Sequence, residues 1–364
     1  MNQRQSELGR SLTVEERFDL LDALVTDMSK GNKLNLLIYD GELLYVHTNY
    51  ADSLYYRARE GALLFATTPL DSGNWEPHPF TTLCAYRDGR LVFQGTNHGR
   101  QYRDNGRKIV ENPLIYRDGK YAIDFDDFER KVTEHNVKRF ILCSPHNPIG
   151  RVWTVEDLRR LGSICQMHGV YVVSDEIHCD FAFPEHPHHV FLEAVPELAE
   201  RAVVCTAPSK TFNLAGLQVS NIWIPSGDIR KRFLLEIART GYSQLNTMGL
   251  VACQAAYESG GEWLEQCRAY LRGNLDFLRA FLRERIPQIR PVEPEGTYFA
   301  WLDCSDLKLN RRELNDLIVN RARLWLDAGH IFGQDAGQFQ RVVLACPRAT
   351  LRQALEKLEQ AVVE

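Results

Sequence analysis

Three short apolar runs in the middle of the chain set the pattern of the predicted fold. The run RFILCS ends at Ser144, the run VYVVSD ends at Asp175, and the run AVVCT leads into a polar turn that contains Lys210. Apolar runs of this length, separated by helical patterns, are typical of parallel strands that are buried on both faces. We therefore predict an α/β sheet that delivers these polar residues to its carboxyl edge.

The intervals between the polar residues fit such a sheet. Asn147 lies in the turn after the first run, and the intervals from Asn147 to Asp175 and from Asp175 to Lys210 each leave room for one helix and a return strand. Ligands of open α/β sheets bind outside the carboxyl ends of the strands. We expect these three side chains to line one crevice.

From Thr154 onward the sequence predicts alternating helices and strands. Thr154 and Asp157 predict a capped amphipathic helix, and residues 245–285 predict long helices with a leucine stripe, Leu271, Leu275, Leu278 and Leu282. The segment GTYFAWLDC begins a smaller α+β unit, which contains the strand FQRVVLACP and a final amphipathic helix, Leu351–Val363.

The first hundred residues follow a different pattern. Thr13 and Glu16 form a capping box before an amphipathic helix, and hairpins turn at Asp40-Gly41 and Asp88-Gly89. A helix followed by antiparallel hairpins does not continue a parallel sheet, so we predict that residues 1 to about 95 form a unit of their own. An alternative is that the run Leu91–Gln94 adds a strand to the sheet that carries Lys210.

Composition narrows the class of protein. The 364 residues are 44% hydrophobic and 25% charged, with a net charge of −5, which is typical of a globular protein and argues against nucleic-acid or anionic-membrane surfaces. Nine cysteines without CxxC pairs suit reduced thiols better than a disulfide framework or a zinc site. Apolar runs of membrane-spanning length and a signal-peptide core are both absent from the sequence, so we expect a cytoplasmic protein.

Three motifs carry a family resemblance. The segments SPHNPIGRVW, VVSDEIH and APSKTFNLAGLQ resemble the class I/II aminotransferase family of pyridoxal-phosphate (PLP) enzymes, and within it the C-S lyase, cystathionine β-lyase-like subgroup. The resemblance covers about residues 105–364. It implies the α/β PLP fold type I, with a mostly parallel sheet in a large domain at 105–260, which lacks its usual N-terminal part, and a small α+β domain at 261–364.

The resemblance assigns roles to residues. It implies that Lys210 holds the cofactor aldehyde covalently and moves the substrate Cα proton, that Asp175 faces the pyridine nitrogen, and that Asn147 donates to the phenolic oxygen. Arg341 would clamp the carboxylate of the amino acid. The other expected cofactor contacts are a packed His178 and the hydroxyls of Thr206 and Ser209.

Two other groups of residues have side chains that could bind a metal or a substrate. His186, His188 and His189 resemble a metal cluster by composition alone, and their Pro-rich setting favours a surface loop, so we predict no metal site. Tyr298 either approaches the substrate or packs in the core, and an aromatic residue in an alternating strand is more often core.

Residues 1–104 carry a second resemblance. Segments such as ALLFATTPLDSGNWEPHPFTTL and GTNHGRQY are similar to the C-terminal part of a class II glutamine amidotransferase domain, here as a truncated α+β fragment. That family uses a cysteine at the mature N-terminus, whereas Met1 is followed here by Asn2, and Cys84 lies inside a strand pattern. We expect no glutaminase activity.

Three functions are compatible with these patterns. The first is a PLP-dependent C-S β-lyase that converts cystathionine or a cysteine S-conjugate to thiol, pyruvate and ammonia, and assembles as a homodimer as in the family. The second is a PLP-dependent aminotransferase that uses the same residues. The third is an inactive fusion protein, because the glycine-rich phosphate turn and the ring-stacking aromatic of the family have no counterpart in residues 1–104, and we expect weak cofactor retention.

Overall fold

The computed structural model describes residues 2–30, 32–59, 62–100, 107–240, 242 and 244–363. The chain divides into two compact units, residues 1–109 and 110–364. The predicted boundary between residues 104 and 105 lies in the segment 101–106, outside the described residues. The helices of the described residues include none that is long and apolar enough to cross a membrane.

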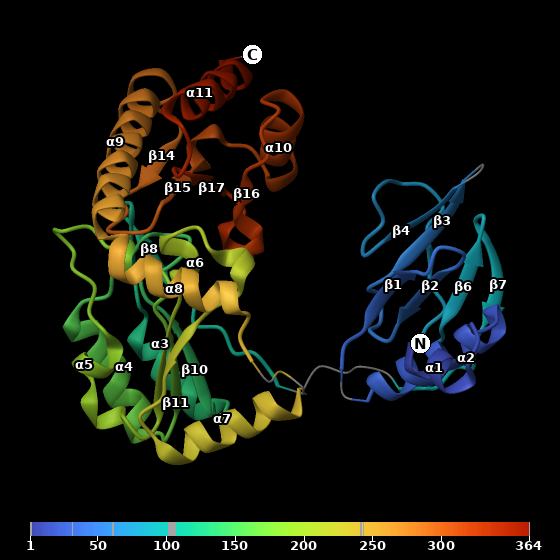
Figure 1. Ribbon diagram of the computed structural model, residues 1–364. Helices are drawn as coiled ribbons and strands as arrows, with labels where there is room; N and C mark the ends of the chain where they lie inside the picture. Colours follow the sequence, from blue (N-terminus) through green and yellow to red (C-terminus); the bar gives the residue numbers. More distant parts are fainter. Residues whose placement is uncertain are drawn as a thin grey trace. The chain divides into compact units, whose positions relative to one another are not determined.

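The first unit consists of helices and antiparallel sheets (Figure 1). Its helices are α1 (Asn2–Leu8) and α2 (Val14–Met28), and its larger sheet has the order β1 (Asn35–Tyr39), β2 (Leu44–Thr48), β6 (Cys84–Arg87) and β7 (Arg90–Gln94). A smaller sheet has the order β4 (Ala62–Ala66), β3 (Tyr55–Arg59) and β5 (Glu76–Pro77).

Local sequence signals explain the first unit. Thr13 Oγ1 accepts from the backbone N–H of Glu16, and the Glu16 carboxylate accepts from the backbone N–H of Thr13, so the predicted capping box is confirmed. Both predicted hairpins form, as β1–β2 and β6–β7. Because β7, which contains Leu91–Gln94, pairs with β6 of its own unit, the alternative that this run joins the Lys210 sheet is wrong.

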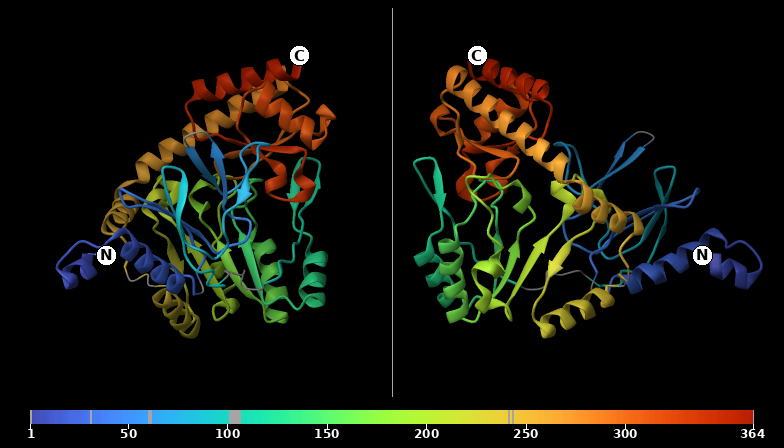
Figure 2. Two further views of the ribbon diagram at one scale, coloured as in Figure 1. Left: turned by 90° about the vertical axis from the view of Figure 1, so that its right-hand side faces the viewer. Right: turned by 60° about the vertical axis from the view of Figure 1, so that its left-hand side comes forward.

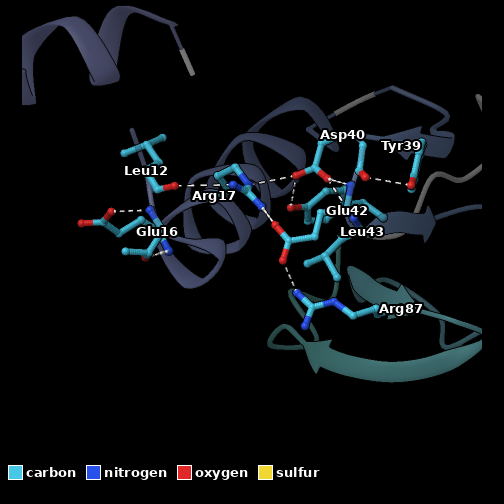
Figure 3. A network of polar contacts seen from close by, with 11 residues as sticks. Leu12, Glu16, Arg17, Tyr39, Asp40, Glu42, Leu43 and Arg87 are labelled. Atoms are coloured by element: carbon cyan, nitrogen blue, oxygen red, sulfur yellow. Dashed lines mark hydrogen bonds and ion pairs between the residues drawn. The ribbon is translucent and has the colours of Figure 1, made fainter. Parts of the chain in front are cut away.

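An ionic network ties α2 to two turns of this unit (Figure 3). Arg17 pairs with Asp40 through Nε at 2.9 Å and with Glu42 through Nη2 at 2.6 Å. Arg87 at the end of β6 also pairs with Glu42. The network lies beside a buried cluster in which Phe18 and Leu21 of α2 pack on the sheet.

The second unit contains a four-stranded sheet with the order β10 (Arg139–Cys143), β11 (Tyr171–Asp175), β12 (Ala202–Thr206) and β13 (Asn221–Trp223). The first three strands are parallel, which confirms the prediction, and β13 is antiparallel to β12. The accompanying helices are α3 (Phe125–Glu134), α4 (Val155–Met167), α5 (Phe191–Ala194), α6 (Pro208–Thr211), α7 (Gly227–Arg239) and α8 (Thr247–Ser259), and β8 (Ile115–Arg117) pairs with β9 (Lys120–Ala122).

Capping and burial position these helices. The Thr154 side chain and the Asp157 side chain form the predicted capping box of α4. Leu158 and Leu161 of α4 are buried with Val172 of β11 in one core cluster. The helix therefore covers the sheet and fixes the strand ends that follow it.

The second unit also carries a smaller antiparallel sheet (Figure 2). Its order is β14 (Arg290–Val292), β15 (Phe299–Asp303), β17 (Phe339–Val343) and β16 (Asp327–Ala328), and its helices are α9 (Gly261–Arg285), α10 (Arg311–Asp316) and α11 (Arg348–Val363). The predicted leucine stripe of α9, at residues 271, 275, 278 and 282, is buried in this core. The final helix begins at Arg348, earlier than the predicted Leu351.

Candidate functional site

The carboxyl ends of the parallel strands meet at one edge. Cys143 pairs with Asp175, and Asp175 pairs with Cys205, so β10, β11 and β12 end side by side. The backbone N–H of Ser144 donates to the carbonyl of Asp175 at 2.9 Å. Thr206 ends β12, and Lys210 follows it in the short helix α6. The strands thus bring Asp175 and Thr206 to one edge.

Arg341 joins the two sheets of the second unit. Its Nη1 donates to Oδ1 of Asn147 at 2.7 Å, although the two residues are 194 positions apart in the sequence. With Oδ1 used in this way, the Nδ2 group of Asn147 is the part of the amide that can donate to a ligand. The carboxylate-clamp candidate and the turn after β10 therefore belong to one site.

The Arg341 side chain is held from several sides. Its Nε and Nη2 donate to Oδ2 of Asp327 at 3.1 and 2.7 Å. Its Cζ lies 4.2 Å from the ring centroid of Phe299 and 4.7 Å from that of Phe332. Only 15% of the side chain is exposed, so the guanidinium is largely fixed in place.

His178 is buried close to the Arg341 site. The residue is 3% exposed, and its ring makes edge contacts with Tyr298 and Phe299. Burial, together with the positive charges of Lys210 and Arg341, lowers the pKa of His178 to about 4. The imidazole is therefore neutral at neutral pH, and Lys210 and Arg341 both lie close enough to act on it.

Polar groups at this edge remain available to a ligand. The Asp175 carboxylate accepts from the backbone N–H of Ile177 through Oδ1 at 3.2 Å. Ser144 Oγ and His178 Nδ1 are buried and have no hydrogen-bond partner among the described residues. Lys210 is exposed, and Thr206 and Ser209 are half-buried. Buried polar atoms normally have partners, so these two atoms are candidates for contacts with a ligand.

The prediction of a surface loop holds for residues 184–187, which are exposed, and fails at His188. His188 is not on the surface: its side chain is 10% exposed, and its Nε2 lies 2.8 Å from Oε2 of Glu176. Glu176 is 1% exposed and also accepts from Ser174 Oγ and the Phe191 backbone N–H. A buried carboxylate needs several donors, and the loop folds back to supply one. The sequence signal was Glu176 itself, directly after a strand end.

Comparison with known proteins identifies the family. Residues 96–358 match the family model of aminotransferase class I and II. The chain belongs to this family. Within it, the chain is 42% identical over 257 residues to cystathionine beta-lyase PatB of Bacillus subtilis, a match that covers 71% of this chain and 66% of PatB.

Solved structures in the family have the same fold. Cystalysin from Treponema denticola, which contains a PLP cofactor, has a TM-score of 0.69 and 36% identity, with 71% of this chain and 65% of that chain covered. The PLP-bound C-S lyase from Staphylococcus hominis has a TM-score of 0.66 and 35% identity, with coverage of 70% and 65%. The second unit therefore has the PLP fold type I. The chain spans slightly less than two thirds of the length of these relatives.

Asp327 is the residue of this candidate site that the sequence analysis did not single out. Asp327 lies in the two-residue strand β16, opposite Arg341 in the β16–β17 pairing. Nothing in the local pattern of LWLDAGH distinguishes this aspartate from one in an exposed loop.

Proposed function

We propose that this chain is a PLP-dependent carbon-sulfur β-lyase, which converts cystathionine or a cysteine S-conjugate to a thiol, pyruvate and ammonia. The observation that carries the proposal is the hydrogen bond between Arg341 and Asn147, which joins the expected carboxylate clamp to the expected cofactor edge. The names of the relatives, a cystathionine beta-lyase and a C-S lyase, support the reaction class.

The residues at the ring end of the site fit PLP. Asp175 offers a carboxylate with an unused oxygen, Asn147 offers an amide N–H, and Lys210 offers an exposed amine on a short helix beside the same strand edge. When bound, PLP supplies an electron sink for the electron pair released at the substrate Cα. Asp175 would keep that sink effective by accepting a hydrogen bond from the protonated ring nitrogen.

The protein's own groups then divide the work. Arg341 orients the substrate through its carboxylate, and Asn147 fixes the direction of the guanidinium by accepting from Nη1. With PLP bound, the Lys210 amine would be the base that takes the substrate Cα proton. Neutral His178, which senses the charges of both Lys210 and Arg341, adds no competing charge to the site.

The end of the site that would bind the PLP phosphate offers weaker hydrogen-bond donors. The candidates among the described residues are the hydroxyls of Thr206 and Ser209, which are neutral donors. Hydrogen bonds to charged groups are worth about 1.5 to 3 kcal/mol each, so two missing contacts weaken binding by roughly a hundredfold or more. We therefore propose that PLP is held weakly and is lost on dialysis.

The test is product analysis of the purified chain with added PLP and L-cystathionine. The lyase proposal requires equal amounts of pyruvate and thiol and a strict dependence on PLP. Transfer of the amino group to an added 2-oxo acid, without thiol release, would favour the aminotransferase alternative. Absence of both products at saturating PLP would favour the inactive fusion protein.

We further propose that residues 1–104 are a glutamine amidotransferase-like fragment without glutaminase activity. Its helix α2 and antiparallel sheet support the resemblance, and Cys84 is buried in β6. Release of ammonia from glutamine would contradict the proposal. For the PLP unit we propose a homodimer, which sedimentation analysis can test. We also propose that the protein is cytoplasmic.

A further inference from the structure

The contact between Asp327 and Arg341 is the starting point. The strands β16 and β17 are labelled in Figure 1. The two residues pair across these antiparallel strands, so the backbone itself holds the carboxylate beside the guanidinium. Nε and Nη2 of Arg341 both donate to Oδ2 of Asp327, at 3.1 and 2.7 Å. Asp327 thus places a carboxylate of the protein on the Arg341 guanidinium. In the proposed function, the same guanidinium binds the carboxylate of the substrate.

The donors of Arg341 can be counted. A guanidinium has five N–H groups, and a bidentate carboxylate uses two of them. Asp327 takes one from Nε and one from Nη2, and Asn147 takes one from Nη1. Two N–H groups remain, which is the minimum for a bidentate substrate, and a bound substrate would lie next to the Asp327 charge.

The charge of Asp327 opposes binding of an anion. It neutralises the positive charge of Arg341, and its own carboxylate repels a second one that approaches the same guanidinium. The carboxylate is 36% exposed, so it can turn toward solvent without the cost of burying an unpaired charge.

We propose that Asp327 is an affinity-determining residue, whose carboxylate competes with the substrate carboxylate for Arg341. This proposal rests on the proposed function, because it takes Arg341 as the substrate clamp. Substrate binding must either displace Asp327 or share the guanidinium with it. The competition raises the KM for amino-acid substrates and leaves the later proton transfer by Lys210 unchanged.

The kinetic test compares Asp327→Asn with the wild-type protein at saturating PLP. The amide keeps the size of the side chain and removes its charge, so we expect the KM for L-cystathionine to fall about tenfold with kcat within twofold. Asp335→Asn is the matched control. Asp335 is an exposed aspartate between β16 and β17, and its substitution changes the net charge of the protein by the same amount. An unchanged or higher KM in Asp327→Asn would overturn the proposal.

A second readout does not depend on the lyase reaction. Labelling of Arg341 by 4-hydroxyphenylglyoxal in the cofactor-free protein, followed by peptide mass spectrometry, measures how far the guanidinium is occupied. We expect severalfold faster labelling in Asp327→Asn than in wild type or Asp335→Asn, and stronger protection by added propionate. Equal labelling in all three proteins overturns the competition, whereas faster labelling without lyase activity overturns the proposed function alone.

Discussion

Removal of the imidazole of His178 should change how stability depends on pH. In the unfolded chain the imidazole has the ordinary pKa of 6.5, and in the folded chain burial and two nearby cations lower the pKa to about 4. Between these values the unfolded chain binds more protons than the folded chain. The free energy of unfolding therefore falls as the pH falls through this window, and it is insensitive to this group above about pH 7.

The size of the effect follows from the pKa difference. A pKa shift of one unit corresponds to about 1.4 kcal/mol, so full protonation of His178 lowers the free energy of unfolding by about 3 kcal/mol. About 2 kcal/mol of this decrease occurs between pH 7 and pH 5. His178→Phe keeps a ring against Tyr298 and Phe299 and removes the titration. The pH-dependent loss should be smaller in the variant by about 2 kcal/mol.

The assay is urea unfolding of the cofactor-free protein at pH 7 and pH 5, followed by tryptophan fluorescence. Trp153 and Trp301 are buried in the second unit and report its unfolding. His146, whose pKa burial also lowers to about 4, contributes equally to both proteins and cancels in the difference. His135→Gln, at an exposed position, is the control. Equal losses in wild type and His178→Phe would refute the reasoning.

Two further predictions concern the cofactor edge and the fold. Asp175→Asn should still bind PLP but release pyruvate roughly ten to a hundred times more slowly, because a neutral amide does not hold the ring proton and an ionic hydrogen bond is worth about 1.5 to 3 kcal/mol; near-normal turnover would contradict the role of Asp175. Thr154→Ala should lower the free energy of unfolding by about 1 kcal/mol through loss of the α4 capping box, measured by urea unfolding, and an unchanged midpoint would contradict the capping argument.

Local and periodic signals predicted much of the fold. The capping boxes at Thr13 and Thr154, the two hairpin turns and the three parallel strands each depend on residues that are close in sequence, and all of them form. The strand ends also predicted that Asn147, Asp175 and Lys210 would follow strands that end at one edge of the sheet, and β10, β11 and β12 end side by side. These features follow from rules about neighbouring residues, so one sequence is sufficient to predict them.

Long-range polar pairs could not be predicted in the same way. The pair of Glu176 and His188 and the pair of Arg341 and Asp327 depend on how loops and short strands return to the site. The loop of His188 is rich in proline and histidine, which predicts a surface position. His188 is instead largely buried, because it contacts the buried carboxylate of Glu176. Composition predicts the average exposure of a segment. Which charged group the segment contacts is decided by tertiary packing.

The most direct test of the central claim is to locate the covalent attachment of PLP. The purified protein is mixed with PLP, reduced with borohydride, digested, and mapped by mass spectrometry, with Lys210→Ala and Lys138→Ala treated in parallel. We predict that the pyridoxyl group is found on Lys210 in wild type and in Lys138→Ala, and is absent from that peptide in Lys210→Ala. Labelling of a different lysine, to the same extent in wild type and Lys210→Ala, would contradict the assignment of the site.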